Sequence, residues 1–364
     1  MFRKFFFRAL LAVVSITGIV AGGSLLVYAQ DSISGNSNDA YDYPIRPGTE
    51  EWKQLHGFND MLNACQIPEN VLKNMSTAAL VETVLDYPLL FVYTSHNDWQ
   101  QGFDMLVSNF NGLQELFNRK DAGGKLLVKY IEVDPKTIDI QRDDFEKCAF
   151  LTDLYNLQMI LSQQPILKQL STYQTQVLLS ETETKHQLLQ NHPEVYGALG
   201  AKFSSMLIEQ ILGQYDLSRY YWTYIYTPMG SPVLALQMEA EDELTPSQIT
   251  YIDWYYDSQF PYATRIRSAT QMYNCHSYAW HNQASDNTIW LDAPYQAIYW
   301  NDGSYSRWTG VPYNGLIVRY VDDDHSAIIH NVGDHRYISK WGSAGLYVHS
   351  PSHCPYTATT LYYY

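Results

Sequence analysis

The spacing of apolar residues changes near residue 215, and this change constrains the fold more than any other feature of the chain. Between residues 48 and 216, apolar side chains recur about every 3.6 positions, which is typical of helices packed on a core. Beyond Leu217, aromatic and β-branched runs alternate with Gly and Pro, which is typical of strands and turns. We therefore expect an α+β protein: an all-α domain over 48–216, a β-rich linker over 217–262, and a C-terminal domain over 263–364.

In the helical half, the clearest apolar stripe runs from Phe103 to Phe117, and we expect Gly123-Gly124 to end this helix. A second helix is expected after Ser76 and before Pro88. Further helices are predicted over 144–163, 166–190 and 193–214. No segment of this half shows a cluster of ionisable groups. We therefore expect it to position the second half or to restrict access to its cleft.

In the linker, residues 221–236 predict two strands joined by a tight turn at 228–231. A helix is expected to begin after Thr245, which would cap it, with Pro246 in its first position.

The first 29 residues have the pattern of a secretory signal. Basic residues at Arg3, Lys4 and Arg8 precede a long apolar run, which ends in the small-residue site 27–29. An uncleaved membrane anchor is the alternative, because residues 9–29 are long enough to cross a bilayer. The glycines of the run favour cleavage. We expect a secreted or extracellular, cell-surface protein in which residues 30–47 form a flexible tether. Any membrane contact would come from a retained signal.

The composition excludes one class of partner. The net charge is -15 and the pI is near 5.0, which argues against nucleic acid. The chain also contains 31 tyrosines, a residue that stacks on sugars and peptides when exposed. For any single tyrosine, a place on a β surface is the simpler interpretation.

The residues with chemical potential lie in the last hundred positions. Cys275 is expected at the first turn of a helix, where unpaired N–H groups and the helix dipole favour a thiolate. Strands are expected over 315–321, 325–330 and 336–341, so His325 would begin the second of them. A cysteine is mostly protonated at neutral pH, and an adjacent imidazole both activates it and protonates the leaving group. Ser339, on the neighbouring strand, is the candidate for orienting His325.

The segments YNCHSYAWH (273–281), GLIVRY (315–320) and HSAIIHNVGDHRYISKWG (325–342) resemble the Cys-His core of NlpC-type cell-wall peptidases and CHAP amidases. The resemblance covers about residues 220–364. It implies a papain-like domain with an antiparallel sheet, with Cys275 as nucleophile and His325 as base. Two positions depart from the pattern: Leu316 replaces an acidic residue, and Ser339 or Lys340 occupies the orienting position. Flanking segments are similar to secreted bacterial proteins of unknown function.

The function expected from the resemblance is hydrolysis of an amide or isopeptide bond by a cysteine peptidase or amidase without a cofactor. Cell-wall stem peptides or their cross-links are the first choice of substrate. A non-catalytic binding module on the same scaffold is the main alternative. A cysteine-dependent acyl transferase is the third, since an amine can intercept an acyl-enzyme.

Other readings of the same residues remain open. Cys275 could pair with Cys354 in a disulfide, while Cys65 and Cys148, on apolar helix faces, could pair or stay buried. The histidines of the C-terminal half do not show the spacing of a metal site. The acidic run 322–324 is expected to be a solvated turn, with a cation or a substrate amine as its alternative ligand.

Overall fold

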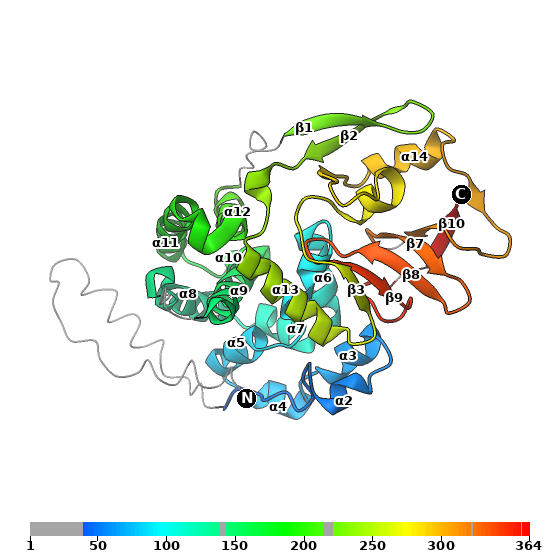
Figure 1. Ribbon diagram of the computed structural model, residues 1–364. Coiled ribbons are helices and arrows are strands. Elements are labelled where there is room, and N and C mark those ends of the chain that lie inside the picture. The colour runs from blue at the N-terminus through cyan, green and yellow to red at the C-terminus, as the bar shows by residue number, and fades with distance from the viewer. Residues whose placement is uncertain (1–38, 138–142, 214–220, 322, 358) are drawn as a thin grey trace.

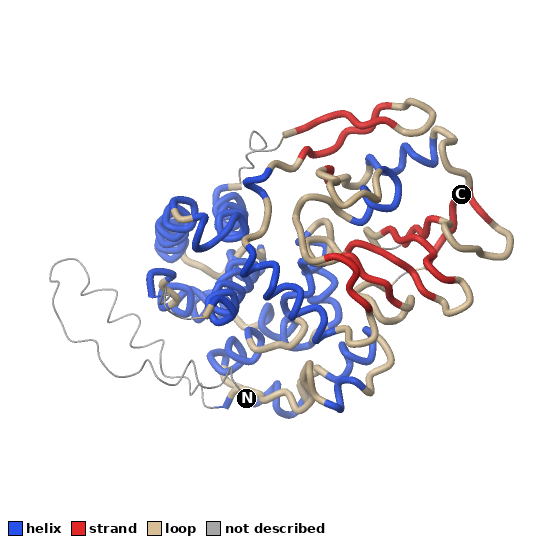
Figure 2. The backbone as a smooth tube through the Cα atoms, in the orientation of Figure 1, coloured by secondary structure: helices blue, strands red, loops and turns tan. Residues whose placement is uncertain are grey.

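The computed structural model describes residues 39–137, 143–213, 221–321, 323–357 and 359–364, and it shows a mixed α+β protein with antiparallel sheets (Figures 1 and 2). The predicted signal segment and most of the predicted tether lie outside the described residues. Within those described ranges, no helix combines the length and apolarity needed to cross a membrane.

The first half of the described chain is helical, as the 3.6-residue period predicts. Its α-helices are α2 Glu50–Lys53, α3 Phe58–Ala64, α4 Glu69–Asn74, α5 Thr77–Leu85, α6 Trp99–Asn109, α7 Asn111–Asn118, α8 Ala122–Glu132, α9 Asp144–Leu161, α10 Gln164–Leu167, α11 Thr172–Asn191 and α12 Pro193–Leu212. Two 3₁₀ segments, η3 Leu90–Ser95 and η4 Pro135–Thr137, lie between them. The helix expected after Ser76 is confirmed as α5, and the Ser76 hydroxyl accepts a hydrogen bond from the N–H of Ala79 at 3.2 Å.

Two predicted helices are interrupted, which corrects the sequence analysis. The helix expected from Phe103 to Gly124 is divided at Phe110, whose backbone is extended, and Gly123 and Gly124 lie inside α8. The division is fixed from outside, because the Asn111 amide bonds both the N–H and the carbonyl of Ile67. The helix expected over 166–190 is likewise two helices, α10 and α11, and Ser171 caps the second.

The second half contains two antiparallel sheets. Its strands are β1 Trp222–Tyr226, β2 Pro232–Gln237, β3 Thr264–Arg267, β4 Ile289–Trp290, β5 Arg307–Trp308, β6 Ile317–Tyr320, β7 Ser326–Asn331, β8 Arg336–Lys340, β9 Leu346–His349 and β10 Thr360–Tyr363. The larger sheet has the order β3-β9-β8-β7-β6-β10-β5, and the smaller one has the order β1-β2-β4. Its helical segments are η5 Ala240–Asp242, α13 Pro246–Gln259, η6 Ser277–His281, η7 Tyr295–Ala297 and α14 Ile298–Asn301.

The local predictions for this half agree with the structure. β1 and β2 form the expected hairpin, with Trp222 opposite Leu236, and the turn lies at 227–231. Thr245 caps α13 in a capping box with Gln248, and Pro246 occupies its first turn. The three strands expected around His325 are β6, β7 and β8, which lie side by side in the larger sheet.

One hydrophobic core extends through both halves. It joins helix residues such as Tyr93 and Phe203 to Tyr256 of α13, Trp341 after β8 and Tyr356. Polar contacts follow the same path: the Trp52 indole donates to the Gln259 carbonyl at 2.9 Å, and the Ser343 N–H donates to the Thr94 carbonyl at 3.1 Å. Figure 1 shows α13 lying between the helices and the larger sheet. Because of this packing, the segment around 94–98 of the helical half lies against the C-terminal half.

Candidate functional site

Cys275 begins a short helical stretch that continues into η6, as the sequence predicts. The preceding residue holds this start in place. Asn274 Oδ1 accepts hydrogen bonds from the N–H groups of Ser277 at 3.0 Å and Leu291 at 3.2 Å, and its Nδ2 donates to the Leu291 carbonyl at 2.7 Å. Asn274 is fully buried, so these bonds fix the backbone from which the Cys275 side chain projects.

The thiol of Cys275 meets a side chain from the helical half. Asn97, which follows η3, donates from Nδ2 to Cys275 Sγ at 3.2 Å. The same Nδ2 lies 3.2 Å from the Asp324 carbonyl oxygen, and that oxygen is 4.0 Å from Sγ. Cys275 is 1% exposed, so Asn97 and the backbone at Asp324 cover the sulfur. An amide N–H beside the sulfur stabilises negative charge there.

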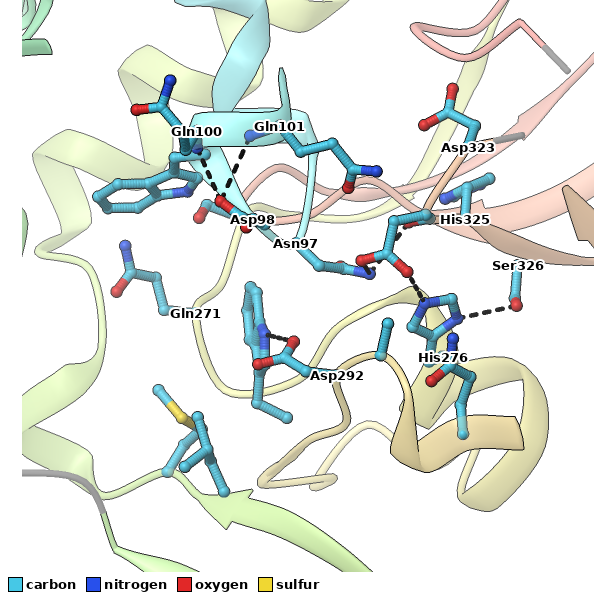
Figure 3. A pocket seen from close by; sticks show the side chains of 18 of the residues that line it. Asn97, Asp98, Gln100, Gln101, Gln271, His276, Asp292, Asp323, His325 and Ser326 are labelled. Carbon is cyan, nitrogen blue, oxygen red and sulfur yellow. Dashed lines mark hydrogen bonds and ion pairs between the residues drawn. The ribbon is translucent and has the colours of Figure 1, made fainter. Parts of the chain in front are cut away.

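His276 forms a buried pair with Asp324 next to this thiol. Its Nε2 is 2.7 Å from Asp324 Oδ1, and its Nδ1 is 2.9 Å from Ser326 Oγ (Figure 3). Ser326 also accepts a hydrogen bond from the Trp280 indole at 2.8 Å. Burial by itself lowers the pKa of His276, but the charges of Cys275 and Asp324 raise that pKa well above its usual value. The ring is therefore an imidazolium, and the same interaction stabilises a thiolate at Cys275.

The acidic run before His325 is mostly covered, which corrects the expectation of a solvated turn. The side chains of Asp323 and Asp324 are each 12% exposed, while Asp322 lies outside the described residues. Burial raises the pKa of Asp324, yet the charge and hydrogen bond of His276 hold it below its usual value. Asp323 has no such cation bonded to it, and burial raises its pKa to about 6. Asp324 is therefore the carboxylate that fixes the orientation of His276.

His325 lies at the start of β7, as predicted, but the structure does not bring it to the thiol by a hydrogen bond. Neither of its ring nitrogens has a hydrogen-bond partner among the described residues. The ring is fully buried and stacks on Tyr356 with a centroid separation of 3.5 Å. Burial lowers the pKa of His325 well below its usual value, so the ring is neutral.

Ser339 and Lys340, the candidates for orienting His325, have other partners. Ser339 Oγ lies 2.8 Å from His349 Nε2 and accepts from the Trp341 indole at 3.1 Å. Lys340 Nζ donates to the carbonyls of Thr270 and Gly342, and burial lowers its pKa to about 7. The expected contact from strand β8 to His325 is therefore absent from the described part of the chain, because His349 on the adjacent strand β9 binds Ser339.

A cavity of about 1080 Å³ opens beside these groups. His276, Asp324, His325 and Ser326 line one part of it, together with Asn97 (Figure 3). Other parts of its wall come from α6, α12 and the β1-β2-β4 sheet. Its size is within the range of small-molecule and peptide-side-chain sites. A substrate in this cavity would lie between the two halves of the protein.

Three site residues were missed or dismissed in the sequence analysis. Asn97 was missed because the helical half shows no cluster of ionisable groups, although a polar run, THND-like in character, follows the apolar η3 at 94–98. His276 was considered only as a metal ligand, and Asp324 only as part of a solvated turn. Each lies next to a predicted residue, Cys275 or His325. A charged neighbour of a candidate nucleophile was the available signal.

The alternatives for the cysteines and for metal can now be compared with the structure. All four cysteines are free, so Cys275 and Cys354 do not form the alternative disulfide. Burial raises the pKa of the thiols of Cys65, Cys148 and Cys354 to about 12. Among the described residues, no group of three or more His, Cys, Asp or Glu side chains is arranged to hold a metal ion.

Comparison with known proteins assigns no relative: no family model, curated protein or solved structure matches the chain.

Proposed function

We propose that this protein is a cysteine hydrolase, a peptidase or amidase, with Cys275 as its nucleophile. One observation carries the proposal: the thiol lies beside a buried imidazolium–carboxylate pair, His276–Asp324, at the wall of a large cavity. Such a pair costs free energy to bury and is typical of sites where a charged nucleophile is needed. The amide of Asn97 adds a hydrogen-bond donor to the sulfur.

In the proposed reaction, the Cys275 thiolate attacks the carbonyl carbon of a substrate amide. The oxyanion is stabilised by the Asn97 amide and by the N–H of Cys275 at the start of its helix. The tetrahedral intermediate collapses to a thioester as the C–N bond breaks, and the leaving nitrogen takes one proton from His276. Neutral His276 then takes a proton from water, whose oxygen attacks the thioester and releases the acid and the thiolate.

The position of the mobile proton on His276 follows from its two contacts. Nε2 faces the Asp324 carboxylate, so its proton stays in that bond. Nδ1 faces Ser326 Oγ at 2.9 Å, and Ser326 lines the cavity. The exchangeable proton therefore resides on Nδ1, and the Ser326 hydroxyl is the path between the ring and a bound substrate. In this scheme Ser326 is a positioning and relay residue.

The substrate class rests on the sequence. The resemblance of 273–281 and 325–342 to NlpC-type peptidases and CHAP amidases favours stem peptides of the cell wall, or their cross-links. The signal-like N-terminus favours action outside the cytoplasm, as a secreted or cell-surface protein. The papain-like arrangement itself belongs to this proposal, as does His325 in its predicted role of base.

The competing function is a binding module without turnover. The observation that favours it is the cover over the sulfur: Cys275 is 1% exposed and is bonded to Asn97. Acyl transfer would use the same thioester but would deliver it to an amine. Products distinguish the three functions, since hydrolysis gives free carboxylates, transfer gives new amides, and binding gives neither.

The first experiment measures the alkylation rate of Cys275 near neutral pH by mass spectrometry of the folded full chain treated with iodoacetamide. His276→Gln and His325→Gln form a matched pair of variants. We expect fast labelling of Cys275 in the parent and in His325→Gln, and labelling slower by about tenfold or more in His276→Gln, because the stabilising cation is lost. Cys65, Cys148 and Cys354 serve as internal controls that stay unlabelled.

The other outcomes are equally informative. A loss of labelling only in His325→Gln would return the role of base to His325. Slow labelling of Cys275 in every form would reject the hydrolase and favour the binding module. Cell-wall peptides incubated with the parent and with Cys275→Ala then test turnover directly, with release of new amino groups as the readout.

A further inference from the structure

The cavity beside His276 carries an excess of negative charge. Among the described residues, seven carboxylates line it: Asp98, Asp104, Glu209, Asp242, Asp292, Asp323 and Asp324. Of these, Asp324 is matched by His276. Burial, followed by the charge of Asp324, raises the pKa of Asp292 to about 7, which reflects how little positive charge the cavity offers this group.

The lysine and arginine of the wall are already engaged. Lys202 Nζ lies 2.5 Å from Gln271 Oε1 and 3.7 Å from Asp242 Oδ1. The Arg319 guanidinium lies over the Trp300 ring, 4.7 Å from its centroid. Neither cation makes a printed contact with Asp98 or Asp292, whose own hydrogen bonds are with the N–H groups of Gln100 and Gln101 and with the Trp290 indole.

Buried polar atoms in the same wall provide an independent sign of a ligand. Gln271 is 2% exposed and its Nε2 has no hydrogen-bond partner, and Ser343 Oγ, also 2% exposed, has none. Both residues line the cavity, as does Gln296, whose Oε1 is unpartnered too. Buried groups of this kind are normally satisfied, and leaving one unpaired costs about 1–3 kcal/mol. A ligand with amide groups supplies the missing acceptor and donor.

Aromatic side chains complete the wall. Trp99, Trp222, Trp290 and Trp300 line the cavity, and they come from both halves of the chain. Indole faces attract cations as well as apolar groups. Figure 3 shows Asp98, Gln271 and Asp292 arranged around the same space, across from His276.

We propose that this cavity binds a peptide segment that carries a positive charge, a primary ammonium or a guanidinium, with the cation held by Asp98 and Asp292 and a peptide carbonyl held by Gln271. This inference rests on the proposed function, for which it names the substrate class. Selection of the cation is a property of the wall formed by α6, β4 and the segment before Cys275. The thiol chemistry at Cys275 is separate from it.

The test therefore uses Cys275→Ala protein, in which binding is measured without turnover. Two neutral-ended tripeptides are compared by calorimetry: acetyl-Ala-Lys-Ala-amide and the same peptide acetylated on the lysine side chain. We expect the cationic peptide to bind about tenfold more tightly or better, because one charge pair in a partly desolvated site contributes this much. Added salt should reduce the difference.

The matched variants are both helix N-cap aspartates. Asp98→Asn removes a charge from the cavity and keeps the cap of α6, since Asn caps as well as Asp. Asp143→Asn makes the same change at the cap of α9, outside the cavity wall. Asp98→Asn should remove most of the preference for the cationic peptide, and Asp143→Asn should leave it unchanged.

Equal binding of the two peptides would overturn the inference, and so would an Asp98→Asn variant that keeps the full preference together with an Asp292→Asn variant that does the same. Failure of the proposed function gives a different pattern: the cationic peptide binds selectively, but Cys275 of the parent protein is slow to alkylate and releases no product.

Discussion

Ser339 connects two other buried side chains in the larger sheet. The Trp341 indole donates to its oxygen, and its own hydroxyl is placed to donate to His349 Nε2, while His349 Nδ1 faces the Ser350 carbonyl at 2.9 Å. All three side chains are fully buried. This chain of hydrogen bonds is complete only when His349 is neutral and carries its proton on Nδ1.

Ser339→Ala should therefore lower stability without changing the thiol chemistry. The variant leaves the Trp341 indole N–H and His349 Nε2 unpaired in the core, which costs about 1–3 kcal/mol. We expect this loss in the free energy of unfolding measured with denaturant, together with an unchanged alkylation rate of Cys275 in the folded protein. Ser108→Ala, on the exposed face of α6, is the control for stability. Slower alkylation in Ser339→Ala would instead support its predicted role in orienting a catalytic histidine.

The neutral state of His349 also predicts a dependence on pH. Burial lowers the pKa of His349 to about 4, below the value near 6.5 in an unfolded chain. As the pH falls from 6.5 toward 4, the unfolded chain binds a proton that the folded protein does not, so stability from this group is lost over that window. His349→Gln does not titrate. Between about pH 7.5 and 5, the variant should lose less unfolding free energy than the parent, by on the order of 2 kcal/mol.

Measuring a difference between two proteins is necessary here, because other groups titrate in the same range with the opposite sign. The raised pKa values of Asp292 and Asp323 stabilise the folded protein as the pH falls. Arg336 and His353 act on His349 itself and are the same in both proteins. Parallel pH profiles for the parent and His349→Gln would show that His349 is not held neutral.

At the scale of elements, the sequence predicts what depends on local periodicity. The strands β6, β7 and β8, the β1–β2 hairpin and the capped helices α5 and α13 are all visible in the pattern of apolar and capping residues. The break at Phe110 is not, because it depends on Asn111 binding the backbone of Ile67, which is distant in sequence. The order of the strands in the larger sheet is likewise a tertiary property.

The candidate site divides in the same way. The placement of Cys275 at a helix start and of His325 at a strand start follows from local sequence, and both placements are confirmed. The contacts between Asn97 and Cys275 and between His276 and Asp324 join segments 178 and 48 positions apart. No local pattern encodes such a contact. A sequence can nominate the nucleophile, but its charge partners are set by how η3, η6 and the β6–β7 connection pack together.

At the scale of the whole molecule, the halves are joined by backbone packing as well as by side chains. Gly342, in the turn between β8 and β9, has a φ of 47° and lies directly against η3. A Cβ at this position would be 2.5 Å from the carbonyl of Ser95. The Tyr356 hydroxyl donates to the same Ser95 carbonyl at 2.6 Å. The segment that carries Asn97 is therefore held by the C-terminal half.

This packing predicts that the two halves unfold together. Thermal unfolding followed in the far ultraviolet reports mainly the helices, while near-ultraviolet circular dichroism reports buried aromatic residues such as Trp280 and Trp341; both signals should change in one transition. Gly342→Ala should lower the midpoint of both signals equally, because the added methyl group forces η3 and the β8–β9 turn apart. Gly230→Ala, also at positive φ but in open space, should have a much smaller effect. Two separate transitions in the parent, or a shift of only one signal in Gly342→Ala, would mean that the halves are independent domains and that Asn97 reaches Cys275 only when they are docked.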